Sequence, residues 1–170
     1  MAPINVLLVL ILFAPNEDAD DDEKDHIYER LDQVIREYRK GRECAIMMGD
    51  FNGKVGVNRE EDTIGPFGVG MRNDNGERVV NFCKRHNLFA TNTWFQQKKS
   101  SQHTWISPDK VTKNQIDCVL VDKRFRNGIQ HSKSMAGADC DSDHNPVIVK
   151  MKIRLQRVKK SKKDSQVEQK

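Results

Sequence analysis

The sequence predicts a single α/β domain in which two packed, mixed sheets carry helices on their outer faces. Three observations support this prediction. The chain has 170 residues, which suits one domain with a core of its own. Its apolar segments follow the order strand, helix, strand, helix, and several consecutive strands come after them. Hydrophobic residues make up 36% and charged residues 32%, as in a soluble globular protein.

The first element is the apolar run at 6–13, which stops before Pro15. This run is too short to span a membrane. It has the apolar character of a signal peptide, but no Lys or Arg precedes it and no Ala-x-Ala site follows it before the acidic stretch. We therefore interpret it as a strand buried on both faces. We expect a protein that has no membrane segment, is not secreted and lies in the nucleus or cytoplasm.

A helix is predicted after the acidic stretch 16–25, which contains seven Asp and Glu. Apolar residues recur at helical spacing over 27–38, and Gly41 marks the end of the helix. Acidic residues at the start of a helix and basic residues at its end suit the helix dipole. For the three adjacent Asp at 20–22, a capped helix start is favoured over a metal site.

The later elements follow from the same patterns. A short buried strand is predicted at 44–48, a Gly- and Asn-rich loop at 50–74, and a helix at 75–87. Loops of that length usually have a function. Trp105 is assigned to the core rather than to a surface that stacks on bases. Further strands are predicted at 88–95, 103–106, 115–121, 129–135 and 146–155.

The folded domain is expected to cover residues 1–155, and a basic tail to cover 156–170. From 150 to 170 there are nine Lys and Arg against two Asp and Glu, a net charge of +7. Because the whole chain carries +4, residues 1–149 carry −3. The composition of the tail is typical of disorder. Its charge could add non-specific contacts with DNA phosphates, or the tail could be a solubilising or nuclear-targeting extension.

The four cysteines form no Cys-x-x-Cys pair, so their spacing predicts free thiols in a reducing compartment. Cys140 and His144 have the spacing of two zinc ligands. No second pair with such spacing lies nearby, and we therefore do not favour a zinc site.

Asp50 and Asn52 directly follow a predicted buried strand, in the segment Gly49-Asp50-Phe51-Asn52. A carboxylate at such a position can bind a hard metal ion or activate water, and an amide can donate to a phosphate oxygen. The alternative is a plain turn, because Gly, Asp and Asn are common turn residues.

Asp117 interrupts an otherwise apolar strand, where a carboxylate is costly unless it is paired. A histidine imidazole is a suitable partner, and a solvent-facing carboxylate at a strand end is the alternative. Asp143 and His144 come just before the last predicted strand. They could contact a metal and a phosphate, or they could form a turn ahead of Pro146.

Taken together and in this order, the motifs resemble the endonuclease/exonuclease/phosphatase family with the DNase I-like fold. Within that family they are most similar to endonuclease domains of non-LTR retrotransposon reverse transcriptases and to craniofacial development protein 2-like proteins. The resemblance covers about residues 4–155 and implies a four-layer α/β sandwich. The segments that carry it are Phe13-Ala14-Pro15-Asn16, Gly49-Asp50-Phe51-Asn52, His103-Thr104-Trp105, Ile116-Asp117 and Ser142-Asp143-His144.

The resemblance also implies a reaction, the attack of water on a phosphodiester of DNA assisted by Mg²⁺ or Mn²⁺. Asp50 would orient or activate the water and share the metal with Asp143. His144 would bind the scissile phosphate while Asp117 holds its imidazole. The remaining substrate-binding residues implied by the resemblance are Asn16, Asn52 and Thr104.

Two departures from the family pattern bear on activity. Phe13 stands where the family has a Tyr whose hydroxyl reaches the phosphate. The family also has an earlier sheet half with an Asn and a metal-binding Glu, and this sequence starts after both. The first strand would then lack a neighbour, and either a missing N-terminal half or a partner chain would cover its apolar surface.

Three functions follow from these features. One is a retrotransposon-type nicking endonuclease impaired by truncation. The second is an inactive fragment that binds DNA or a protein. The third, a lipid phosphohydrolase, is disfavoured because no segment other than the apolar run at 6–13 resembles a lipid-facing surface.

Overall fold

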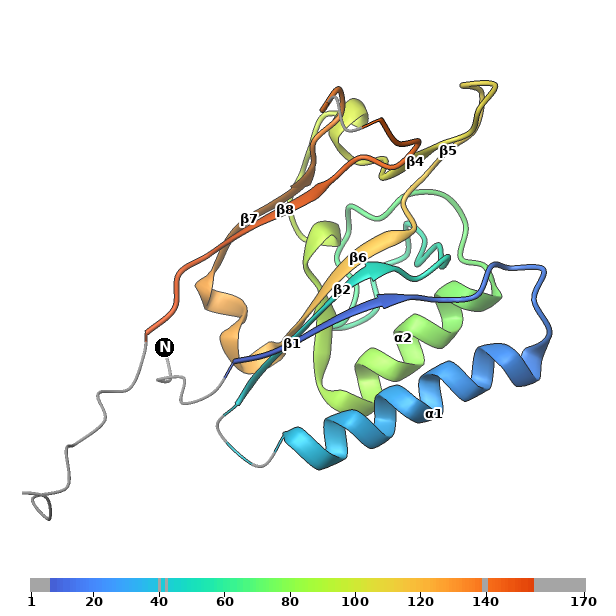
Figure 1. Ribbon diagram of the computed structural model, residues 1–170. Coiled ribbons are helices and arrows are strands. Elements are labelled where there is room, and N and C mark those ends of the chain that lie inside the picture. The colour runs from blue at the N-terminus through green and yellow to red at the C-terminus, as the bar shows by residue number, and fades with distance from the viewer. Residues whose placement is uncertain (1–6, 40, 42, 139–140, 155–170) are drawn as a thin grey trace, which may run out of the picture.

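The computed structural model describes residues 7–39, 41, 43–138 and 141–154. A four-stranded sheet has the order β1-β2-β6-β3, and β7 and β8 form a second sheet. Two α-helices cover one face of the four-stranded sheet, and the second sheet lies on the other face (Figure 1). This arrangement confirms the predicted α/β class with facing sheets. The basic tail and Cys140 lie outside the described residues.

The register of the four-stranded sheet brings the ends of β1 and β2 together. β1 runs parallel to β2, and β6 runs antiparallel to both β2 and β3. The C-terminal ends of β1 and β2 therefore lie beside the N-terminal end of β6, at the same end of the sheet. The four strands are β1 (Leu7–Phe13), β2 (Cys44–Asp50), β6 (Asp117–Asp122) and β3 (Leu88–Ala90).

Both α-helices begin at side-chain caps. The Asp20 side chain caps α1 (Asp21–Tyr38), and its carboxylate accepts a hydrogen bond from a first-turn N–H at 2.9 Å. The Asn73 side chain caps α2 (Asp74–His86) in the same way, also at 2.9 Å. Such caps satisfy N–H groups that the helix itself leaves unpaired. The acidic stretch is thus a capped helix start, as predicted.

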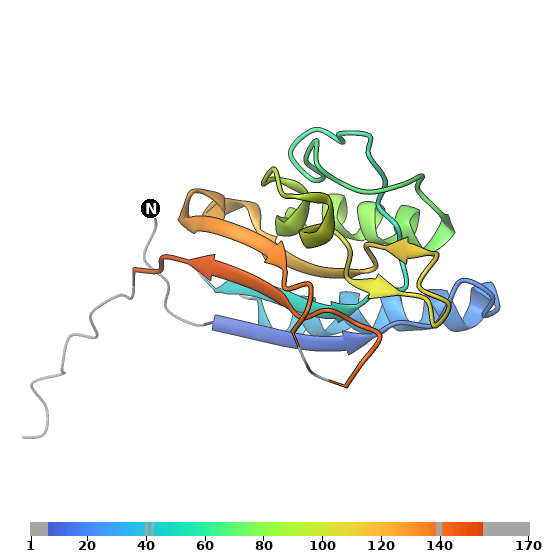
Figure 2. The same ribbon diagram turned by 90° about the horizontal axis from the view of Figure 1, so that it is seen from above.

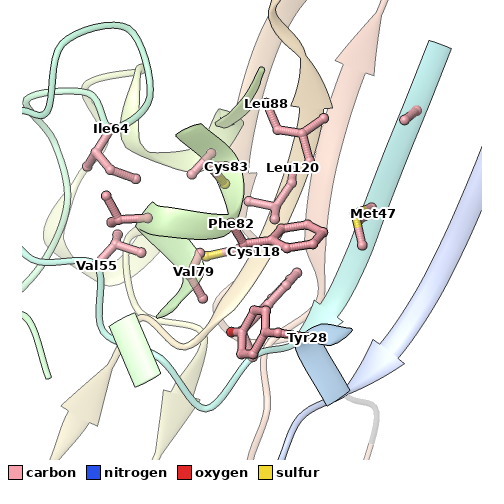
Figure 3. Close-up of a cluster of buried hydrophobic side chains, with 14 of the residues drawn as sticks. Tyr28, Met47, Val55, Ile64, Val79, Phe82, Cys83, Leu88, Cys118 and Leu120 are labelled. Atoms are coloured by element: carbon pink, nitrogen blue, oxygen red, sulfur yellow. The ribbon is translucent and has the colours of Figure 1, made fainter. Parts of the chain in front are cut away.

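The main hydrophobic core lies between the helices and the sheet. Met47 of β2 and Leu120 of β6 are fully buried on the face that meets the helices. Tyr28 of α1 and Phe82 of α2 pack beneath them with ring centroids 5.7 Å apart (Figure 3). Because side chains alternate along a strand, their neighbours in sequence point to the other face.

The second core fills the space between the two sheets. Val119 and Val121 of β6 contribute to it, and the inward side chains of β8 are only half-buried there. A hollow of about 170 Å³, lined by apolar side chains of β2, β6 and β8, remains between the sheets. Figure 2 shows the second sheet beside the first from above. Its strands are β7 (Ile129–Ser134) and β8 (Val147–Met151).

The first strand exists as predicted, but the expectation that it is buried on both faces is wrong. β1 alternates between exposed and half-buried residues, and Ile11 is 81% and Phe13 75% exposed. Their side chains lie on the face of the second sheet, which does not extend over β1. Within the described residues β1 pairs only with β2, so its outer edge has no neighbouring strand.

Several other predicted boundaries change. The strand predicted at 88–95 ends at Ala90, where the Thr93 hydroxyl donates to the Ala90 carbonyl at 2.7 Å and closes a 3-10 turn. The strand predicted at 103–106 is the short β4 (Trp105–Ile106). Its partner β5 (Lys113–Asn114) was not predicted, because two polar residues carry no strand pattern.

Neither described α-helix has the length and hydrophobicity needed to cross a membrane. Cys44, Cys83 and Cys118 are buried free thiols, as predicted. Burial raises the pKa of the Cys44 thiol to about 11, so this group stays protonated and unreactive at neutral pH.

Candidate active site

Two carboxylates lie side by side at the end of the sheet where β2 ends and β6 begins. Asp50 and Asp117 are direct partners in the antiparallel register. Both lie on the face of the second sheet, because they alternate in phase with Met48 and Val119. Gly49 allows the close approach of β1 at this point, since a Cβ there would lie 1.8 Å from the Leu12 carbonyl oxygen.

His144 joins these carboxylates from the turn that precedes β8. Its Nδ1 lies 3.1 Å from Oδ2 and 3.3 Å from Oδ1 of Asp117. Its Nε2 lies 3.9 Å from Oδ2 of Asp50. A backbone bridge to Trp105 of β4 holds the turn in place. The imidazole therefore stands between two carboxylates, and Asp117 fixes the orientation of its ring.

Asp50 is the more buried of the two carboxylates and is 8% exposed. Burial, followed by the negative charges of Asp117 and Asp143, raises the pKa of the Asp50 carboxyl, although the Asn52 N–H and His144 oppose the shift. A carboxylate with a raised pKa is a better proton acceptor than an ordinary Asp. Asp50 thus has the electrostatic setting of a general base.

Asn52 lies beside Asp50 in a left-handed backbone conformation with φ of 47°. Its N–H donates to Asp50 Oδ1 at 2.8 Å, and its side-chain amide donates to the Ala14 carbonyl at 2.8 Å. The Ala14 N–H in turn donates to the Asp50 carbonyl at 2.8 Å. These bonds connect the segment after β2 with the segment after β1.

A pocket of about 670 Å³ opens in front of these residues. It brings together Asp50, Asn52, His144 and Asn16 from three separate segments of the sequence. Lys54 also lines the pocket and adds a positive charge that the sequence did not single out. The remaining lining side chains include Phe13, Glu17, Asp18, Asn73, Trp105, Asn114 and Ile116.

Asp143 is exposed and lies outside this pocket, in a neighbouring hollow that Lys110 and Lys113 also line. Its Oδ2 accepts a hydrogen bond from the Trp105 indole at 2.8 Å. The assignment of Trp105 to the core is therefore wrong, since this half-buried residue lines the pocket and holds Asp143. Its indole N–H needs a partner, and the carboxylate supplies it.

Thr104, predicted to bind substrate, is 1% exposed. Its hydroxyl oxygen accepts hydrogen bonds from the backbone N–H groups of Ile116 and Asp117, both at 3.0 Å. Its hydroxyl therefore contacts the backbone at the start of the strand that carries Asp117, and Thr104 does not line the pocket.

The carboxylate and amide oxygens at this site are of the kind that binds a hard cation. Within the described residues, no group of three or more His, Cys, Asp or Glu is arranged to hold a metal ion. Mg²⁺ usually takes only one or two carboxylates and completes its shell with water and substrate phosphate. Asp50, with Asp143 nearby, could supply that small number.

Comparison with known proteins identifies the lineage. Residues 7–148 match the model of a family described as endonuclease-reverse transcriptase. Craniofacial development protein 2 of Bos taurus is 36% identical over 159 residues, which are 94% of this chain and 26% of that protein. The protein of the same name from Tragulus javanicus is 36% identical over 94% of this chain and 27% of its own. The chain thus spans about a quarter of the length of these relatives.

Solved structures share the fold at low sequence identity. The endonuclease domain of TRAS1, a telomere-specific non-LTR retrotransposon, has a TM-score of 0.59 and 16% identity, over 85% of this chain and 57% of that one. The 3′ phosphatase NExo from Neisseria, bound to a product DNA hairpin, has a TM-score of 0.61 and 16% identity, over 85% and 60%. The fold is that of the endonuclease/exonuclease/phosphatase proteins, which confirms the predicted DNase I-like class.

Proposed function

The chain belongs to the endonuclease-reverse transcriptase family, and from this premise we propose that it is part of a divalent-metal-dependent phosphodiesterase that nicks DNA. One observation carries the proposal. Asp117, His144 and Asp50 form a connected series although they come from three separate segments, and His144 and Asp50 line one pocket with Asn52. A phosphodiesterase needs a proton acceptor, a cationic group for the phosphate and amide donors, and these residues supply all three.

The roles follow from the contacts. Asp50 takes the proton of the attacking water, because its burial favours the protonated form. His144, held at Nδ1 by Asp117, stabilises the charge that develops on the phosphate. Asn52 uses one amide proton for Ala14 and has a second for a phosphate oxygen. Asn16, which also lines the pocket, binds the substrate from the segment after β1.

Mg²⁺ or Mn²⁺ bound at Asp50 and Asp143 would neutralise charge on the scissile phosphate. Trp105 keeps the Asp143 carboxylate in place for that role. Thr104 acts through the backbone of Asp117, because both hydrogen bonds of its hydroxyl are with the Ile116 and Asp117 N–H groups.

The proposed substrate is DNA, and the proposed reaction is nicking at a target site. Two similar proteins support this choice, since one is the endonuclease of a retrotransposon and the other was solved with a DNA hairpin. The Lys54 side chain in the pocket adds a charge suited to a phosphate backbone. The basic tail would add further phosphate contacts. A DNA substrate agrees with the nuclear or cytoplasmic location expected from the sequence.

Full activity is proposed to require more polypeptide than the 170 residues. The described chain covers 57% of the TRAS1 endonuclease domain. Within the described residues, the face of β1 that carries Ile11 and Phe13 is uncovered, and so is the outer edge of this strand. A second sheet half, on the same polypeptide or from a partner chain, would cover this surface.

The test is nicking of supercoiled DNA by the 170-residue chain with Mg²⁺ or Mn²⁺. The His144→Ala variant is expected to lose about 100-fold or more in rate, because the phosphate loses its cationic partner. His131→Ala is the matched control, since His131 lies on β7 and its ring contacts Phe95. Equal cleavage by the His144→Ala variant and the wild type would overturn the proposed site.

The second candidate is a module that binds DNA or a protein without cutting. Two observations favour it. Within the described residues no three His, Cys, Asp or Glu are grouped to hold a metal ion, and Phe13 lines the pocket without a hydroxyl. Calorimetric titration with Mn²⁺ separates the two candidates. Stoichiometric binding that is lost in Asp50→Asn supports the enzyme, whereas absence of binding together with absence of nicking supports the module.

A further inference from the structure

Asn75, the second residue of α2, is buried directly behind the pocket and is 2% exposed. Its side-chain amide donates two hydrogen bonds, to the Pro15 carbonyl at 3.1 Å and to the Asn52 carbonyl at 3.2 Å. A side-chain amide has two N–H donors, so both are used. One bond holds the residue before Asn16, and the other holds Asn52 itself. A single side chain thus ties together the two segments that carry the polar residues of the pocket.

The contact with Asn52 matters because this residue has a positive φ of 47°. A left-handed conformation outside glycine costs free energy and persists only where the surroundings hold it. The N–H of Asn52 is held by Asp50 and its side chain by the Ala14 carbonyl. Asn75 holds the other backbone polar group, the Asn52 carbonyl. All the backbone polar groups of this residue are therefore engaged.

The helix start that carries Asn75 is fixed by further contacts of its own. The Glu17 carboxylate accepts the N–H of Asp74 at 3.0 Å and the N–H of Asn75 at 3.3 Å. Gly76 packs so closely that a Cβ there would lie 1.9 Å from the Lys54 carbonyl oxygen. The first turn of α2 is thus a rigid support for the segment 52–54.

We propose that Asn75 is a positioning residue that fixes the backbone of Asn52 and the segment before Asn16 for contact with the substrate phosphate. The substrate rests on the proposed function, whereas the effect on the Asn52 backbone does not. Asn75 acts through Pro15 and Asn52 and does not contact the substrate, because it does not line the pocket and both of its N–H donors bond to backbone carbonyls.

The test combines hydrogen exchange with kinetics in the 170-residue chain. Asn75→Ala removes both donors, and Asn75→Asp removes them while it keeps the size of the side chain. We expect the Asn52 backbone amide to exchange about tenfold faster or more in both variants, because its local opening becomes easier. Nicking is expected to fall about 10- to 100-fold in kcat with little change in KM, since misplacement acts on the transition state.

Thr91→Val is the matched control. Thr91 is buried, and its hydroxyl bonds to the Ser132 hydroxyl at 3.1 Å away from the pocket. This variant is expected to lower Tm by a similar amount without faster exchange at Asn52. The inference fails if Asn75→Ala and Asn75→Asp leave Asn52 exchange at the level of Thr91→Val. If the wild type neither nicks DNA nor binds Mn²⁺, the proposed function fails and the exchange result still decides the role of Asn75.

Discussion

The two faces of the four-stranded sheet differ in how well they are covered. On the helix face, Met47 and Leu120 are fully buried beneath α1 and α2. On the face of the second sheet, Ile11 and Phe13 of β1 are mostly exposed. The helix face is therefore the closed face. The face of the second sheet is the open face, because it is covered over β6, where Val121 is fully buried, but not over β1.

This difference separates stability from function. Hydrophobic burial on the helix face supplies the driving force for folding. Asp50 and Asp117 lie on the open face, at the strand ends beside the pocket. A site that must admit a phosphodiester gains from that openness, and the closed face keeps the strands that carry it in register.

The largest expected effect is on the closed face. Leu120→Ala should lower the free energy of unfolding by about 2–5 kcal/mol, because it leaves a cavity in a packed core. Leu7→Ala removes the same atoms from a residue of β1 that is 44% exposed, and should cost about 1 kcal/mol or less. Urea denaturation measures both values. Equal losses would show that the two faces do not differ as described.

An intermediate effect is expected at Asp50, on the boundary between the two regions. Because burial raises the pKa of this carboxyl, its contribution to stability is greatest at low pH and is lost as the pH rises through the folded-state pKa. Asp50→Asn should therefore stabilise the fold at neutral pH, and the gain should vanish in acid. It should also abolish nicking, because the proton acceptor is gone.

Thermal unfolding from pH 3 to pH 8 checks this prediction. Asp18→Asn is the control, since Asp18 is exposed on the rim of the same pocket. A gain that is the same at every pH would contradict the link to the Asp50 carboxyl.

The smallest effect on stability is expected on the open face. Replacing both Ile11 and Phe13 by Thr should change the free energy of unfolding by no more than about 0.5 kcal/mol, because exposed side chains contribute little and Thr suits a strand. Self-association in size-exclusion chromatography should decrease, since less apolar surface is presented. A loss of several kcal/mol would show that this face is packed.

The sequence allowed most of the fold to be predicted. Apolar runs and helical spacing located β1, α1, β2 and α2 because these signals are local. The strand predicted at 88–95 was too long, because the hydrogen bonds that close the turn at Thr93 have no apolar pattern. The short strand β5 escaped prediction for the same reason.

The site residues could be named from the sequence because polar residues at the ends of apolar strands stand out against their surroundings. Asp50, Asn52, Asp117 and His144 were all identified in this way. The sequence could not show that Thr104 turns towards the Asp117 backbone, or that Asn75 holds two segments from behind. A buried Thr or a helix-start Asn has many ordinary roles, and only its partners distinguish among them.

The sequence by itself determined the lineage, the order of the elements and the type of side chain available for chemistry. Alternation along β1 and β2 also fixed which residues share a face. Only the tertiary structure decided what covers each face, that Asp50 stands opposite Asp117, and that His144 lies between them. The physical reason is that alternation and spacing are local properties of a chain, whereas register, coverage and hydrogen-bond partners depend on segments far apart in sequence.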